Sequence, residues 1–115
     1  MVRISVRSTD LIRVLRRYQY LMVTLEGLKY AEKWNFSTQI PQENMKLYQL
    51  LLKMIWMGGK MTINHAIMLG YNEKFLAEAR LNGYVKITRK QDKLPYNIQQ
   101  KISDIIGEAP QQIYA

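Results

Sequence analysis

Apolar residues recur at helical spacing along the first third of the chain. They follow one another at intervals of three and four residues: Leu11, Val14, Tyr18, Leu21, Leu25 and Leu28. This spacing predicts a helix over residues 10–33, with Thr9 or Asp10 as its N-cap. The stripe packs either on the core of its own domain or against a second copy of the chain. We favour a dimer interface at these six positions, because a complete core is predicted downstream and an unpaired stripe would be a large exposed apolar patch.

A second helix with one broad apolar face is predicted over residues 43–57. The residues on this face are Leu47, Tyr48, Leu51, Leu52, Ile55 and Trp56. A polar interruption over residues 34–42 separates it from the first helix, and Pro41 suits the first position of a new helix. Gly58 and Gly59 end the apolar pattern. This helix is expected to hold the elements that follow it at a fixed angle.

Shorter elements follow in a regular order. Thr62 can cap a helix over residues 63–69, and Gly70 allows a tight turn because glycine readily adopts a positive φ. Asn72 can cap a second short helix, which Gly83 would end. The pattern then changes to a two-residue repeat over residues 84–88, and again at Leu94, Tyr96 and Ile98, on either side of a basic tip. This alternation predicts a β-hairpin, followed by a closing helix over residues 99–106.

This order of helix, tight turn, helix and hairpin resembles the winged helix-turn-helix family, in its MarR-like and PadR-like branches. The residues that show it are Gly58-Gly59 before Lys60-Met61-Thr62, the Gly70 turn, the run from Leu81 to Val85, and the run from Tyr96 to Lys101. The resemblance covers about half of the chain. One departure is Ala79, where the family usually has a large apolar residue, so packing there would rely on Phe75 and Leu76.

The resemblance and the spacing together predict one mainly α-helical domain with a small β-hairpin. Its parts would be an extra dimerisation helix over residues 10–33, a winged helix-turn-helix core over residues 43–106, and a loose tail over residues 107–115.

Charge and composition narrow the function. The chain has 115 residues and a net charge of +8. The excess lies in two places: five arginines against one aspartate in residues 1–17, and four cations against Asp92 in residues 84–96. Two basic clusters indicate an anionic partner, and with a helix-turn-helix order they indicate DNA.

Other chemistry is poorly supported by the sequence. The chain has no cysteine and one histidine, His65, without carboxylates at ligand spacing, so we expect no catalytic residue, metal or cofactor. No apolar run reaches the length of a membrane span, and no signal-peptide pattern is present. We therefore expect no membrane contact and a cytoplasmic, nucleoid- or plasmid-associated protein.

In the winged helix-turn-helix family, the second helix of the motif enters the major groove by its N-terminal half. The resemblance implies three groups of DNA contacts in this chain. They are Tyr71, Asn72, Lys74, Ala77, Glu78 and Arg80 on the second helix, Lys60, Thr62, Asn64 and His65 on and before the first, and Arg89, Lys90 and Lys93 in the wing. Asn72 has capping as an alternative role, and for His65 a plain surface role is favoured over a phosphate contact.

We therefore expect a homodimer that binds double-stranded DNA sequence-specifically. The sequence leaves open whether it is a transcriptional regulator or a centromere-binding protein of a plasmid-partition system, with or without a further protein of such a complex. The alternative is a winged-helix module that docks another protein. The basic wing favours DNA, because a protein-docking module does not need four cations there.

Overall fold

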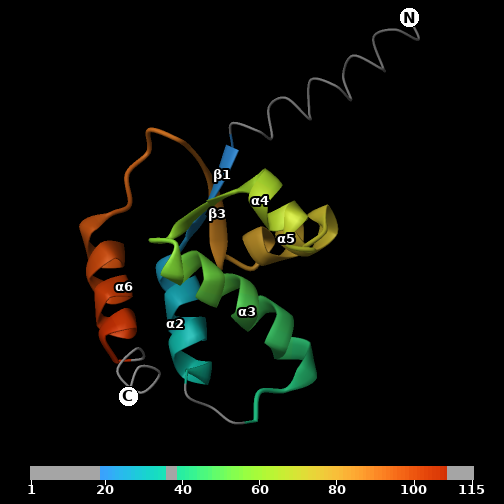
Figure 1. The fold of residues 1–115 in the computed structure, drawn as a ribbon, viewed down its shortest axis with the longest axis horizontal. Coiled ribbons are helices and arrows are strands. Elements are labelled where there is room, and N and C mark those ends of the chain that lie inside the picture. Colours follow the sequence, from blue (N-terminus) through green and yellow to red (C-terminus); the bar gives the residue numbers. More distant parts are fainter. Residues whose placement is uncertain (1–18, 36–38, 109–115) are drawn as a thin grey trace, which may run out of the picture.

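The computed structural model describes residues 19–35 and 39–108 (Figure 1). Within these ranges it has five helices and one three-stranded antiparallel sheet. The strands are β1 (Gln19–Val23), β2 (Lys60–Thr62) and β3 (Val85–Arg89), and the helices are α2 (Leu25–Trp34), α3 (Gln42–Trp56), α4 (Ile63–Met68), α5 (Glu73–Leu81) and α6 (Tyr96–Glu108). The prediction of a mainly helical chain with a small β element is confirmed at this level.

β1 is the central strand of the sheet, which has the order β2-β1-β3. Leu21 lies opposite Met61 of β2 on one side and opposite Ile87 of β3 on the other. The continuous helix predicted over residues 10–33 is therefore wrong. Residues 19–23 favour a strand because aromatic and apolar side chains fill a buried pleated surface. Thr24 then starts α2, since its hydroxyl oxygen accepts a hydrogen bond from the Gly27 N–H at 3.1 Å.

The six residues of the predicted dimer interface divide into three groups: two are buried, one is partly exposed, and three lie outside the described residues. Leu21 and Leu28 are 1% and 0% exposed and belong to the core of this chain, together with Leu50 and Ile55 of α3. Their assignment to a dimer interface is wrong, because they are already buried within one chain. Leu25 is 36% exposed, and its place in a dimer stays a prediction. The other three positions, Leu11, Val14 and Tyr18, lie outside the described residues.

The predicted second wing strand is also wrong. Residues 94–98 form no strand, and α6 begins at Tyr96. Ile98 is buried on α6 with Ile102 and Ile105, at intervals of four and three residues. These intervals place all three side chains on one helical face. β1 takes the place beside β3 that the second strand was expected to fill, so the hairpin is replaced by a pairing between distant segments.

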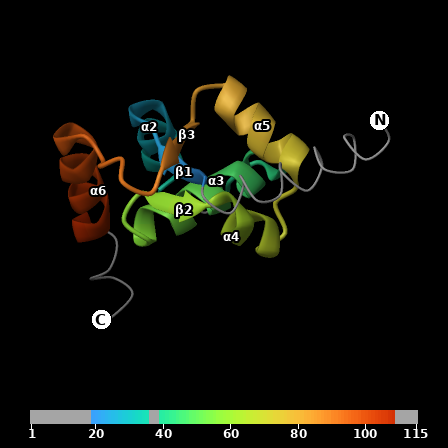
Figure 2. The same ribbon diagram turned by 90° about the horizontal axis from the view of Figure 1, so that it is seen from above.

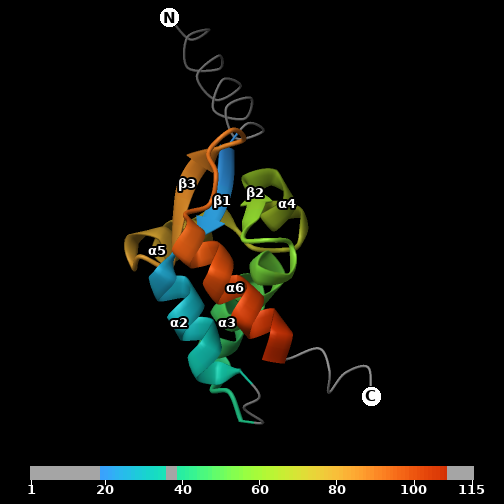
Figure 3. The ribbon, with the colours of Figure 1, turned by 90° about the vertical axis from the view of Figure 1, so that its left-hand side faces the viewer.

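The helices lie on two sides of this sheet. α6 lies on one side and α4 and α5 lie on the other (Figures 1 and 2). The loop that follows β3 lies at one end of the sheet, and α2 and α3 extend from the other end (Figure 3). α6 packs beside α2. Gly107 lies inside α6, so the loose tail predicted to begin there is wrong for residues 107–108. Residues 109–115 lie outside the described ranges.

Candidate nucleic-acid interface

α4 and α5 form a helix-turn-helix around Gly70. Thr62 caps α4 by accepting from the His65 N–H at 3.0 Å, and Asn72 caps α5 by accepting from the Phe75 N–H at 2.8 Å. Gly70 has φ of 103°, and the Tyr71 N–H donates to the Ala66 carbonyl at 3.1 Å, which closes the end of α4. The two predicted caps and the glycine turn are confirmed.

The inner side of α5 holds it on the core. Leu76 and Ala79 are buried and Phe75 is half-buried, as the sequence predicted. Their neighbour Tyr71 was predicted to face DNA, and that prediction is wrong. Tyr71 is 4% exposed, its ring stacks on Phe75 at 5.6 Å, and its hydroxyl accepts from Lys53 Nζ of α3 at 3.2 Å. It follows a helix-ending glycine directly, so its side chain turns back onto the core.

The outer side of α5 carries both cationic and anionic side chains. Lys74, Ala77, Glu78 and Arg80 are exposed. Arg80 and Ala77 line a groove between α5 and the sheet, with Ile63 and Ile87 on its other walls. Glu78 lines a different groove, on the side facing α3. Glu73 lines the groove at the sheet together with Arg80, so α5 offers a cation and a carboxylate there and a second carboxylate, Glu78, toward α3. The Asn72 side chain is occupied by its cap.

The start of α4 contributes less than the sequence suggested. Thr62 is half-buried and its hydroxyl is used in the cap. Asn64 and His65 are exposed in the first turn of α4. Both remain candidates for contacts with a neighbouring phosphate.

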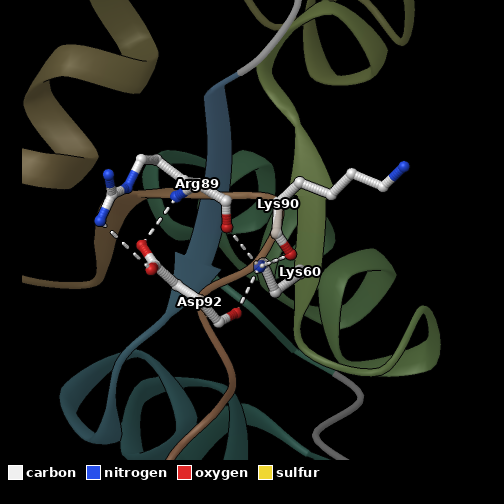
Figure 4. Close-up of polar contacts among 4 residues, drawn as sticks. All are labelled: Lys60, Arg89, Lys90 and Asp92. Atoms are coloured by element: carbon white, nitrogen blue, oxygen red, sulfur yellow. Dashed lines mark hydrogen bonds and ion pairs between the residues drawn. The ribbon is translucent and has the colours of Figure 1, made fainter.

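The last residue of β3 and the four residues after it form a basic turn, which we call the tip turn (residues 89–93). The Asp92 N–H donates to the Arg89 carbonyl at 3.1 Å, and the Asp92 carboxylate accepts from the Arg89 N–H at 2.9 Å. The Arg89 guanidinium also lies 3.9 Å from that carboxylate. Lys90 points away from these contacts (Figure 4). Lys93 is exposed, so the tip turn directs cationic side chains outward from a closed backbone.

The half-buried side chain of Lys60 binds the backbone of this turn. Its Nζ donates to the carbonyl oxygens of Arg89 at 2.8 Å, Lys90 at 3.3 Å and Asp92 at 2.6 Å (Figure 4). The prediction that Lys60 contacts DNA did not anticipate these partners. They are backbone atoms 29, 30 and 32 residues away, so no side-chain pattern in the sequence could reveal them.

The start of β1 is a neighbour of the tip turn that sequence reasoning missed. Gln19 is the register partner of Arg89, so the chain enters the sheet beside the basic turn. The predicted hairpin concealed this neighbourhood, because it assigned the position beside β3 to residues 94–98.

Comparison with known proteins gives no further guide: no family model, curated protein or solved structure matches the chain. Within residues 19–35 and 39–108, no group of three or more histidine, aspartate or glutamate side chains is placed to hold a metal ion. None of the helices in those ranges is long and apolar enough to cross a membrane.

Proposed function

We propose that this protein binds double-stranded DNA sequence-specifically in the manner of a winged helix-turn-helix protein. In this proposal α5 enters the major groove and the tip turn contacts the phosphate backbone. The main support is one arrangement: a helix-turn-helix packed beside an antiparallel strand, with exposed polar residues on α5 and a basic turn at the end of the strand. An α-helix fits the major groove, and cations beside it neutralise phosphates.

The side chains of α5 suit base recognition better than general attraction to phosphate. Lys74 and Arg80 can donate to guanine, and Glu78 can accept from the cytosine amino group. Two glutamates on a nine-residue helix would weaken a purely electrostatic contact with DNA. The side chains of α5 therefore favour recognition of base edges in the major groove.

The wing of this proposal differs from a simple hairpin. β3 pairs with β1, so the basic end of the sheet combines the end of one strand with the start of another. Arg89, Lys90 and Lys93 would contact phosphates, which position a protein on DNA without reading sequence.

Selection of bound sites from a random duplex library tests this function. The selected site and a random duplex are then titrated at two salt concentrations with a helix variant (Lys74→Ala with Arg80→Ala) and a tip variant (Arg89→Ala with Lys90→Ala). The helix variant should lose roughly 1–3 kcal/mol per base contact on the selected site and less on random DNA. The tip variant should weaken binding to both duplexes. Lys29→Ala is the control, because Lys29 belongs to α2, which extends from the opposite end of the sheet.

Failure to select any site, or equal effects of both variants on both duplexes, would contradict sequence-specific recognition. One observation favours a protein-docking module as the alternative: Met68 and Leu81 are 86% and 85% exposed at the ends of α4 and α5. Loss of a protein partner on Met68→Ser or Leu81→Ser, with no DNA binding, would support that alternative. The homodimer and the choice between a transcriptional regulator and a plasmid-partition protein stay predictions.

A further inference from the structure

Lys60 connects three parts of the sheet. It leaves β2 beside the central strand, its Nζ lies 4.9 Å from the centre of the Tyr20 ring on β1, and it ends among three carbonyl oxygens after β3. An ammonium group has three N–H donors and no acceptor. The three carbonyls therefore match the whole hydrogen-bonding capacity of this side chain.

The tip turn is held from two directions. Lys60 binds its carbonyl oxygens, and the Asp92 carboxylate binds the Arg89 N–H and lies near the Arg89 guanidinium. Hydrogen bonds with one charged partner are stronger than neutral ones. In addition, the positive charge of Lys60 offsets carbonyl dipoles that would otherwise repel a phosphate approaching this turn.

We propose that Lys60 is a positioning residue for phosphate binding by the tip turn and makes no phosphate contact itself. Lys60 orders the backbone of residues 89–92, so that Arg89, Lys90 and Lys93 are directed at a polyanion before it arrives. An ordered turn loses less conformational freedom on binding, and the affinity rises accordingly. This inference rests on the proposed function for the identity of the polyanion, which is duplex DNA.

The first test needs no DNA. Lys60→Met keeps the apolar stem over Tyr20 and removes the ammonium group. Backbone ¹⁵N order parameters of residues 89–93 should fall from about 0.85, the value of rigid backbone, toward 0.6 or less. Lys29→Met, the control, should leave them unchanged. Unchanged order parameters in Lys60→Met would overturn the proposal. If Lys60→Met fails to fold by circular dichroism, Lys60→Arg replaces it in this measurement.

Lys60→Arg separates positioning from direct contact on DNA. Arginine keeps the charge and binds phosphate well, but its planar fork of donors does not match three converging carbonyls. A positioning role predicts that Lys60→Arg binds a generic duplex as weakly as Lys60→Met. Wild-type affinity in Lys60→Arg would show a direct phosphate contact and overturn the proposal.

The last test compares Lys60→Met in the wild-type protein and in a variant whose tip turn has lost its three cations. Lys60→Met should flatten the slope of log K against log salt by more than about 0.9, the value for a single neutralised phosphate. In a background of Arg89→Gln, Lys90→Gln and Lys93→Gln, it should have no further effect, because nothing remains to be positioned. A further weakening there would overturn the proposal. If the wild-type protein binds no duplex, the proposed function and the polyanion role both fail, while the order parameters still decide whether Lys60 orders the turn.

Discussion

Gly27 is a single residue that decides how closely α2 packs on the rest of the chain. A Cβ at Gly27 would collide with the carbonyl oxygen of Tyr84 and would lie 2.9 Å from a Val23 methyl group. The same Tyr84 carbonyl accepts from the Thr24 N–H at 3.2 Å, and the Thr24 hydroxyl donates to the Gly83 carbonyl. The first turn of α2 therefore packs directly on the backbone that leads from α5 into β3.

Gly27→Ala should destabilise the fold because the added methyl group meets backbone, which cannot move aside like a flexible side chain. We expect a loss of about 1–3 kcal/mol in the free energy of unfolding, measured by urea denaturation. Gly107→Ala is the matched control in α6: no atom of residues 19–35 and 39–108 is recorded within 4 Å of its Cβ position, and alanine favours a helix. It should be neutral or stabilise by up to about 1 kcal/mol. Equal effects of the two substitutions would contradict this packing.

The sequence predicted the role of a residue correctly where the partner of that residue lies nearby along the chain. Thr62, Asn72, Gly70 and Gly83 were assigned correctly, because caps and helix-ending turns involve neighbours within a few residues. Lys60 and Tyr71 were assigned to DNA from their polarity and position. The hydrogen-bond partners of both side chains lie on other segments, the tip turn for Lys60 and Lys53 of α3 for Tyr71, and a single sequence gives no signal for them. Only the stacking of Tyr71 on Phe75 is local.

Sequence periodicity misassigned two elements, β1 and the strand predicted over residues 94–98, and β1 is the one that decides the sheet. Leu21, Leu25 and Leu28 keep helical spacing across a boundary between a strand and a helix. The pattern alone cannot distinguish a buried central strand from a turn of helix, because both are apolar over four or five residues. The partners that make β1 a strand, β2 and β3, lie far along the chain.

Leu21→Ala therefore tests the strand against the dimer interface. If Leu21 is a core residue, Leu21→Ala should lower the free energy of unfolding by about 2–5 kcal/mol. This loss should not depend on protein concentration. A dimer interface would instead make the unfolding midpoint rise with concentration. Leu25 is the first residue of α2 and is 36% exposed, so Leu25→Ala should cost less than Leu21→Ala. Urea denaturation over a hundredfold range of protein concentration measures both effects. A concentration-dependent wild-type midpoint that Leu21→Ala abolishes would restore the dimer interpretation.

On the scale of the whole molecule, the central place of β1 brings Gln19 beside Arg89, in the second basic cluster of the sequence. The sequence has two basic clusters about seventy residues apart, in residues 1–17 and 84–96. Because Gln19 pairs with Arg89, the chain leaves the first cluster and enters the sheet beside the second. The pairing of Gln19 with Arg89 follows from the strand order, which the predicted hairpin had obscured.

If the two clusters act on one polyanion, arginines near the end of the first cluster should add to the salt dependence of DNA binding. Arg16→Gln with Arg17→Gln should flatten the slope of log K against log salt by up to about 0.9 for each phosphate that the variant no longer neutralises. The preference for a selected site over a random duplex should not change, because phosphate contacts carry no sequence information. Lys29→Gln with Lys33→Gln removes the same charge from α2, at the far end of the sheet, and should leave the slope nearly unchanged. Equal slopes for the two double variants would show that only net charge matters, and that the position of β1 beside the tip turn has no role in binding.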